Sequence, residues 1–281
     1  MTEYTAVTDV EPGHDDVSGK TVLSLRDATL AYGRRVLWRD LDLDLRGGEF
    51  VAVLGPNGSG KTSLLRVLLG QQPLSAGTLL IDGRPPRRGS DLIGYIPQHR
   101  SVAAHTPLRA RDLVRLGIDG HRWGLPLAGG RVRRRVEELL AAVGAAAYAD
   151  LPLGLLSGGE QQRVRVAQAL ATDPILLLCD EPLLSLDLNH QRAVAALVDR
   201  RRREHGTAVV FVTHEINPIL QYVDRVLYLA EGRFRIGPPE EVMTSAVLSE
   251  LYGSPVEVIR AQGRFVVVGA PGSDDHGGET P

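Results

Sequence analysis

Apolar and polar residues follow one another in short blocks that each suit a single strand or helix. Two blocks near the start, 22–32 and 38–45, alternate apolar and polar side chains, as half-buried antiparallel strands do. Continuous apolar runs predict buried parallel strands at 50–54, 175–179 and 208–212. Helical patterning predicts helices at 62–69, 109–116, 132–143 and 191–203.

Turn residues delimit the remaining strands. Asp82-Gly83 ends one short strand, and Glu231-Gly232 joins two others into a hairpin. These short strands are predicted at 78–81, 226–229 and 234–236, with a last pair at 256–259 and 265–268. Helical patterning with arginines occupies about 101–143. Because strands alternate with helices, we expect an α/β fold with a parallel core, and we interpret this arginine-rich helical block as an insertion into it.

The two ends of the chain differ from this middle part. Residues 1–20 and 271–281 are polar and lack periodicity, so we predict disordered tails on either side of one domain at 21–270. The longest apolar runs have strand length, and the N-terminus lacks the order of a signal peptide, so we expect a chain that neither spans the membrane nor is exported.

Composition narrows the classes of partner. The net charge of −2 favours no nucleic-acid partner, since such binding usually needs a basic face. The single cysteine, Cys179, excludes an intramolecular disulfide and fits a cytosolic setting. It lies in a predicted buried strand, where we expect a core residue.

A glycine-rich motif lies between a predicted strand and a predicted helix. It reads Gly55-Pro56-Asn57-Gly58-Ser59-Gly60-Lys61-Thr62, which fits the P-loop pattern in the context that the pattern requires. Its glycines let successive N–H groups converge on phosphates at the positive end of the helix. Lys61 would reach the β- and γ-phosphates, and the Thr62 hydroxyl would be a Mg²⁺ ligand. We expect ATP contacts from Gly55, Asn57, Gly58, Gly60, Lys61, Thr62 and Ser63.

Two acids end a later buried strand. Asp180 stands where a carboxylate for the P-loop Mg²⁺ belongs, and Glu181 follows it. Glu181 would face the γ-phosphate and orient or deprotonate the attacking water, which is worth about 10²–10⁴ in rate. The alternative without function is a glycine-rich turn for the first motif and a strand-terminating acidic turn for the two acids. The P-loop alone indicates only nucleotide binding.

A third motif, Leu156-Ser157-Gly158-Gly159-Glu160-Gln161, opens a helix. Ser157 and Glu160 have the spacing of a capping box. Capping does not explain two glycines in a first turn, where each reduces helix stability by up to about 1 kcal/mol. Exposed N–H groups without side chains suit a phosphate instead.

With these residues the sequence resembles the ABC ATPase family over nearly its whole ordered length, and the third motif, 156–161, is similar to the signature of that family. The resemblance implies a P-loop NTPase core of mixed sheet and helices, an antiparallel β subdomain, and an inserted helical subdomain at about 99–165 that receives a coupling helix. It also implies that Tyr32 stacks on adenine, that Gln98 senses Mg²⁺ and water, and that His214 is the switch histidine. Ser157, Gly159 and the D-loop Asp187 would belong to the nucleotide site.

The resemblance further implies how such a chain works. Two ATP molecules lie between two ATPase domains, with the P-loop of one facing the signature of the other, so this chain needs a homodimeric or paired ATPase domain. The other implied partners are integral membrane permease subunits and, indirectly, a solute-binding protein, at the cytoplasmic face of the cell membrane. One departure is Ser185, where many members have a glycine.

The cargo is suggested by similarity alone. The segments from His214 to Pro218 and from Tyr222 to Val226 resemble ATPases of manganese- and zinc-type importers. No physical reason connects Asn217-Pro218 with metal import. Siderophore, haem or general importers and small exporters stay open. Non-transport ABC proteins are less favoured, because ribosome-acting members usually carry two domains and chromosome-organising members a long coiled-coil insert.

Overall fold

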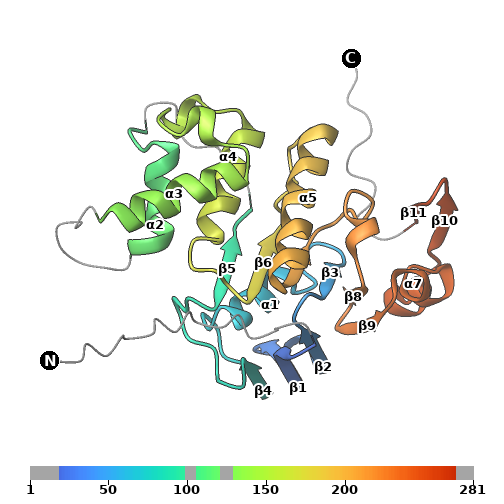
Figure 1. The fold of residues 1–281 in the computed structure, drawn as a ribbon. Coiled ribbons are helices and arrows are strands. Elements are labelled where there is room, and N and C mark those ends of the chain that lie inside the picture. Colours follow the sequence, from blue (N-terminus) through green and yellow to red (C-terminus); the bar gives the residue numbers. More distant parts are fainter. Residues whose placement is uncertain (1–18, 99–105, 121–128, 270–281) are drawn as a thin grey trace, which may run out of the picture.

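A six-stranded sheet forms the centre of the protein (Figure 1). The computed structural model describes residues 19–98, 106–120 and 129–269. All neighbouring strands of the central sheet are parallel except the last pair. The order across the sheet is β5 (Ile93–Ile96), β6 (Leu176–Asp180), β7 (Ala208–Val212), β3 (Phe50–Leu54), β8 (Arg225–Ala230) and β9 (Arg233–Gly237).

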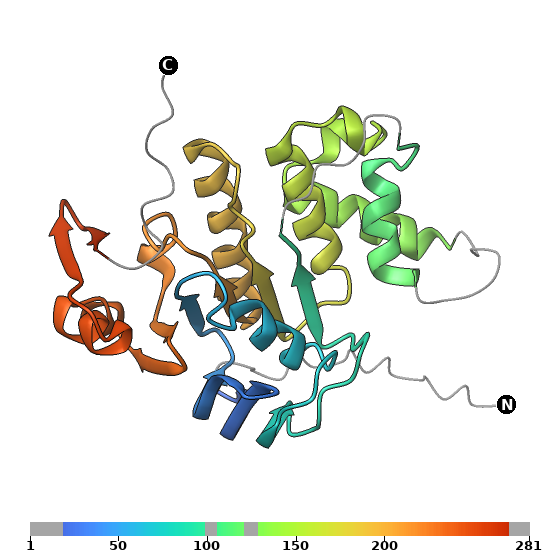
Figure 2. The ribbon, with the colours of Figure 1, turned by 180° about the vertical axis from the view of Figure 1, so that it is seen from behind.

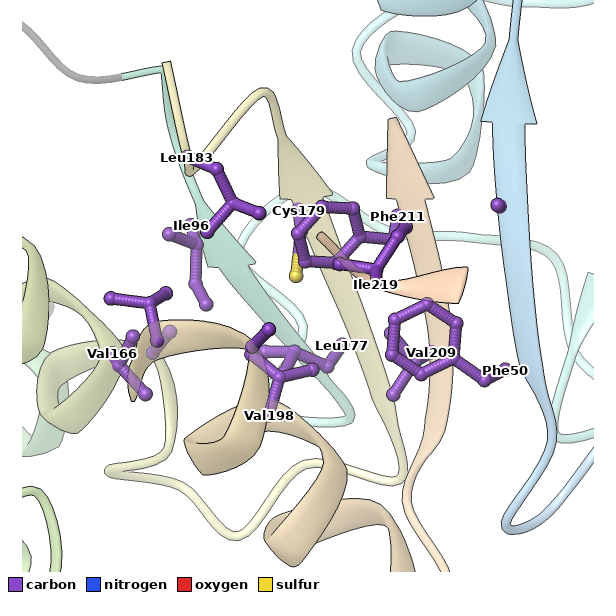
Figure 3. Packing of buried hydrophobic residues seen from close by; sticks show 14 of the residues in the cluster. Phe50, Ile96, Val166, Leu177, Cys179, Leu183, Val198, Val209, Phe211 and Ile219 are labelled. Carbon is purple, nitrogen blue, oxygen red and sulfur yellow. The ribbon is translucent and has the colours of Figure 1, made fainter. Parts of the chain in front are cut away.

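Alternate residues of each central strand enter two separate hydrophobic clusters, because successive side chains of a strand point to opposite faces. Phe50 packs with Phe211 on one face, with ring centroids 5.6 Å apart, while Val51 and Val53 belong to the other cluster. Figure 3 shows the first cluster, which includes the fully buried Cys179, as expected. A sheet buried on both faces explains the continuous apolar runs of its strands.

Helices cover the Phe50 face, and an antiparallel sheet with one helix covers the other. Val194 and Val198 of α5 (Leu188–His205) pack on the first face. On the second, leucines of α1 (Lys61–Leu68) pack with those of a three-stranded sheet. That sheet has the order β2 (Arg35–Arg46), β1 (Thr21–Tyr32) and β4 (Ala76–Ile81).

The arginine-rich block folds into a group of helices beside β5 (Figures 1 and 2). It contains α2 (Ala110–Asp119), α3 (Gly130–Ala142), the 3₁₀ turns η1 (Ala146–Tyr148) and η2 (Leu153–Leu155), and α4 (Gly158–Ala169). Val136, Leu139 and Leu140 of α3 are buried against the rest of the group. The predicted helices at 109–116 and 132–143 are confirmed, the first of them extending to Asp119; residues 99–105 and 121–128 of the block lie outside the described residues.

The C-terminal elements lie on the opposite side of the sheet from the helical group, as both views show (Figures 1 and 2). They are α6 (Pro239–Val242), α7 (Ser245–Tyr252), β10 (Glu257–Ala261) and β11 (Arg264–Val268), which ends the last hairpin. The sequence predicted the hairpin and missed both helices.

The α/β fold class is confirmed, including the antiparallel sheet and the inserted helices. Of the predicted tails, residues 1–18 and 270–281 lie outside the described residues. Lys20, placed in the first tail, forms an ion pair with Asp82 at 2.6 Å. Within the described ranges, no helix has the length and apolar character needed to cross a bilayer.

Candidate active site

The P-loop leaves the end of β3 and enters α1 through three glycines with positive φ. The φ angles are 138° at Gly55, 78° at Gly58 and 102° at Gly60, in the region that favours glycine. At Gly55 a Cβ atom would also lie 2.0 Å from the carbonyl oxygen of Leu229. The loop therefore takes its curled path because glycine occupies these positions.

Lys61 lies inside this curl. Its side chain is buried, and its Nζ donates to the carbonyl oxygens of Gly55 at 2.7 Å and Pro56 at 2.9 Å. Burial lowers the pKa of Lys61, while the charges of Glu181 and Asp180 act to raise it. The ammonium group is thus held under the loop, with two acids near enough to act on it.

The first turn of α1 presents polar groups beside the loop. Thr62 and Asn57 are exposed, and Ser63 is half-buried. The turn contains no acidic side chain, so the partial positive charge of the helix N-terminus has no internal counter-charge there. Such an end is suited to an anion.

Asp180 and Glu181 follow one another at the carboxyl end of β6. Asp180 is buried, and the hydroxyl of Tyr95 donates to its Oδ2 at 3.2 Å. Burial raises the pKa of Asp180, opposed in part by that hydrogen bond. A buried carboxylate with a raised pKa is poorly solvated, and a nearby cation would compensate for this.

Two further expected site residues, Gln98 and His214, lie close to the carboxylate of Glu181. Its backbone has φ 46° and donates its N–H to the carbonyl of Val212 at 2.9 Å. Gln98 Nε2 donates to Glu181 Oε2 at 3.5 Å, and His214 Nδ1 lies 3.9 Å from the same oxygen. The three side chains follow the carboxyl ends of β5, β6 and β7, which are adjacent in the sheet.

The signature begins α4 with the expected capping box. Ser157 Oγ accepts from the N–H of Glu160 at 3.3 Å, and the Glu160 carboxylate accepts from the N–H of Ser157 at 2.8 Å. Gly158 and Gly159 are the first two helical residues. The capping prediction is confirmed.

The D-loop takes the glycine-type conformation without a glycine. Ser185 has φ 64°, in the left-handed region. Asp187 is the N-cap of α5 and accepts from the N–H groups of Asn189 and His190 at 2.9 and 3.0 Å. A serine therefore occupies a position where the backbone is strained and where glycine would be favoured.

Tyr32 lies at the end of β1 close to α1. Its ring is 48% exposed, and its hydroxyl donates to Gln72 Oε1 at 2.5 Å and lies 3.4 Å from Ser63 Oγ. An exposed ring next to the first turn after the P-loop can present a face to a planar ligand.

Three residues near the site were missed from the sequence. Ser59 Oγ is buried in the P-loop and has no hydrogen-bond partner among the residues that the structure describes. Tyr95 donates a hydrogen bond to Asp180, and His190 pairs with Asp187. Ser59 and Tyr95 belong to motifs that were recognised, so their positions could have been inferred. His190 had no signal, because a lone histidine on a helix has none.

Comparison with known proteins agrees with this geometry. The family described as ABC transporter matches residues 38–184, more than half of the chain. The chain belongs to the ABC transporter ATP-binding family. Like the ATP-binding subunits of that family, it binds and hydrolyses ATP, and such subunits work as dimers with membrane permease components.

Two curated relatives and one solved structure show how similar other members of the ABC family are. The hemin import ATP-binding protein HmuV of Streptomyces coelicolor is 39% identical over 250 residues, covering 85% of this chain and 86% of that protein. The zinc import ATP-binding protein ZnuC of Yersinia pestis is 35% identical over 233 residues, covering 83% and 85%. A transporter described as metal-chelate type, in an inward-facing conformation, superposes with a TM-score of 0.75 at 27% identity, covering 88% and 96%.

Proposed function

We propose that this chain is the ATP-hydrolysing subunit that drives an ABC importer from the cytoplasmic face of the cell membrane. The observation that carries the proposal is the meeting of Gln98, Glu181 and His214 at the ends of adjacent strands, with Lys61 close enough to sense the charge of Glu181. These groups supply what phosphoryl transfer to water needs: a phosphate cradle, a cation and a group that orients the nucleophile.

The phosphates of ATP would take the place of the loop carbonyls at Lys61. The ammonium group now bonds to the carbonyls of Gly55 and Pro56, so phosphate oxygens would exchange one set of acceptors for another. The N–H groups of Gly58, Gly60 and the first turn of α1 would donate to the same phosphates. Tyr32, exposed beside that turn, would stack on adenine.

Asp180, Thr62 and Gln98 fit a Mg²⁺ site. Their donors are oxygens, which Mg²⁺ prefers. The charges of Arg66 and Lys61 act on the buried Asp180 but only partly offset the effect of burial on its pKa. Thr62, Gln98 and Asp180 would hold the ion, which would supply positive charge to neutralise charge that develops on the phosphates.

Glu181 would act on water. A water molecule attacks the γ-phosphorus, the bond from phosphorus to the bridging oxygen of ADP breaks, and the Glu181 carboxylate takes the proton of the water. His214, 3.9 Å from Glu181 Oε2, would donate to the γ-phosphate. ADP and inorganic phosphate are the products.

A second copy of the chain, or a homologous ATPase domain, would complete each site. The signature Ser157 and Gly159 lie at the start of α4, where Ser157 is exposed, and Ser157 Oγ accepts the N–H of Glu160 in the first turn. The N-terminus of a helix is suited to a phosphate. We infer that Ser157 and Gly159 contact the ATP held by the P-loop of the partner. A solute-binding protein would deliver cargo to the permease and contact this chain only indirectly.

For the cargo, we favour a metal chelate of the hemin class. The support is the 39% identity to a hemin import subunit, together with a metal-chelate transporter at TM-score 0.75. The chain itself has no group of three metal-binding side chains among its described residues, so cargo recognition would belong to the other subunits.

A free divalent ion, zinc or manganese, is the second candidate. It is supported by the zinc import relative at 35% identity and by the segment around Asn217-Pro218, which resembles metal importers. No single residue of the ATPase site distinguishes the two cargoes.

Uptake by whole cells separates these candidates. A strain without this gene, complemented with the wild-type gene or with Glu181→Gln, is given labelled hemin, zinc or manganese. We expect hemin accumulation to depend on the wild-type gene and to fail with Glu181→Gln. Dependence of zinc or manganese uptake instead would select the second candidate, and net efflux of any of the three would contradict the import proposal.

A further inference from the structure

The imidazole of His190 occupies the space beside the signature glycine Gly159. A Cβ atom at Gly159 would lie 2.0 Å from His190 Cδ2, 2.5 Å from Cγ and 2.7 Å from Nε2. These distances are far shorter than any non-bonded contact of a carbon atom, so the ring fills the volume that a side chain at position 159 would need. Gly159 is buried in consequence.

The other edge of the same ring is fixed by Asp187. His190 Nδ1 lies 2.5 Å from Asp187 Oδ2, and since a carboxylate only accepts, Nδ1 is the donor. The second oxygen of Asp187 accepts the N–H groups of Asn189 and His190. The ring is therefore held by a hydrogen bond on one side and by packing on the other, although its side chain is 38% exposed.

This contact joins the starts of two helices. Gly159 is in the first turn of α4, His190 is in the first turn of α5, and Asp187 is the N-cap of α5. Glu181, the proposed base, precedes Asp187 by a short turn that contains the strained Ser185. The turn from Glu181 to Asp187, the hydrogen bond of Asp187 with His190 and the packing of His190 on Gly159 thus link the end of β6 to the signature of the same chain.

We propose that His190 is a positioning residue for ATP hydrolysis, which sets the place of the signature N–H groups relative to the D-loop. The proposal rests on the proposed function, in which the signature of one chain contacts the ATP of its partner. In that arrangement Glu181 acts on one ATP and Gly159 contacts the other, so His190 connects the two sites of the dimer.

The physical basis is the precision that phosphate donors need. A misplacement of about 1 Å at a reacting centre can reduce the rate about 10²-fold. The first two residues of α4 are glycines, so they have no side chains to pack. The His190 ring packs against Gly159 in their place. A ring that only held the capping Asp187 in place would stabilise the fold and have no separate effect on turnover.

Substitutions at 190 separate the two contacts of the ring. His190→Ala removes both, His190→Phe retains a ring against Gly159, and His190→Asn retains a donor near the Nδ1 position. Asn189→Ala is the matched control, since Asn189 is exposed in the same helical turn and contributes its backbone N–H to Asp187. Each variant is measured for melting temperature, ATP affinity of the monomer and kcat.

We expect His190→Ala to bind ATP with an affinity within about twofold of wild type and to lose about 10- to 100-fold in kcat. His190→Phe and His190→Asn should each recover part of that loss, and Asn189→Ala should behave as wild type. The positioning role is overturned by an unchanged kcat in His190→Ala. It is also overturned by parallel losses of ATP affinity, kcat and melting temperature.

A stability cycle tests the contact without any need for activity. Gly159→Ala should destabilise the wild-type chain, because the new methyl meets the ring. In a His190→Ala chain the same change should be neutral or stabilising, since alanine is the better helix former by up to about 1 kcal/mol. An equal effect of Gly159→Ala in both backgrounds contradicts the contact.

A final arm keeps this proposal apart from the proposed function. Glu181→Gln protein is tested for ATP-driven dimerisation with His190 intact and with His190→Ala. We expect the dimer in the first case and a weaker dimer in the second. No dimer with His190 intact would contradict the composite site, whereas equal dimers in both would contradict only the role of His190.

Discussion

The side-chain amide of Asn217 forms two hydrogen bonds with the backbone of Phe265. Its Nδ2 donates to the Phe265 carbonyl at 2.9 Å, and its Oδ1 accepts the Phe265 N–H at 2.9 Å. Asn217 lies three residues after His214, and Phe265 lies in β11 of the C-terminal hairpin. The segment that carries His214 is thereby attached to the end of the domain, which gives Asn217 a structural reason for its place.

Loss of this amide should loosen the hairpin. Asn217→Ala leaves two partly buried backbone groups without partners, at about 1–3 kcal/mol for an unsatisfied group. We expect the Phe265 amide to exchange its hydrogen faster, with the central sheet unaffected, in hydrogen-exchange measurements. Asn189→Ala at an exposed site is the control, and unchanged protection of Phe265 in Asn217→Ala would contradict the attachment.

Ser185 should respond to substitution as a left-handed residue does. Its φ of 64° suits glycine; a residue with a Cβ atom is disfavoured there by about 1–2 kcal/mol, and a β-branched residue more than serine. Ser185→Val should therefore lower the free energy of unfolding, while Ser185→Gly should leave it unchanged or raise it slightly. Denaturant unfolding checks this, and a Ser185→Gly variant less stable than Ser185→Val would contradict the geometry.

The fold could be predicted well wherever burial leaves a simple pattern. β3, β6 and β7 are buried on both faces, so each appears as an apolar run. β5 was missed because it is short and includes Gly94, whose glycine is needed: a Cβ there would lie 2.4 Å from the Ala169 carbonyl. That close approach is a tertiary property, with no trace in local periodicity.

The residues of the candidate site also divide into those that local sequence predicts and those that it does not. The P-loop, the two acids and the signature have local spacing that reports their chemistry, so their residues could be named in advance. The helices α6 and α7 were missed, although Thr244 is a good N-cap residue and does cap α7. The contacts of His190 with Gly159 and of Asn217 with Phe265 join distant segments, and only the folded chain shows them.

Asp180 should make the nucleotide-free protein less stable as pH rises. Burial raises its pKa above the usual 3.8, so the folded state holds the proton more firmly than the unfolded state does. The destabilisation is absent at pH below 3.8, grows as pH rises from there through the raised pKa, and is complete above it. Asp180→Asn should therefore gain stability over wild type across that window.

The same variant should lose what the carboxylate provides for function. At neutral pH, Asp180→Asn should melt at a higher temperature than wild type without nucleotide and gain less from added ATP and Mg²⁺. Thermal unfolding with and without MgATP measures both effects. A less stable nucleotide-free Asp180→Asn protein would contradict the desolvation argument.

Gly55 should tolerate no side chain. Gly55→Ala combines a φ of 138° with a methyl 2.0 Å from the Leu229 carbonyl, so the loop must move. Gly83→Ala is the matched control, because it has a positive φ of 71° and open space around the Cβ position. We expect Gly83→Ala to lose about 1–2 kcal/mol in stability and keep ATP binding. Gly55→Ala should lose ATP binding, and equal ATP affinity in both variants would contradict the proposed role of the loop.

The mass of Glu181→Gln protein with and without ATP tests the central claim most directly. If Glu181 orients or deprotonates the water and two chains enclose the nucleotide, this variant should bind ATP, fail to hydrolyse it, and form a species of about twice the 30.4 kDa of one chain. ADP should leave it monomeric. A single-chain mass at saturating ATP and Mg²⁺, or hydrolysis at the wild-type rate, would contradict the account.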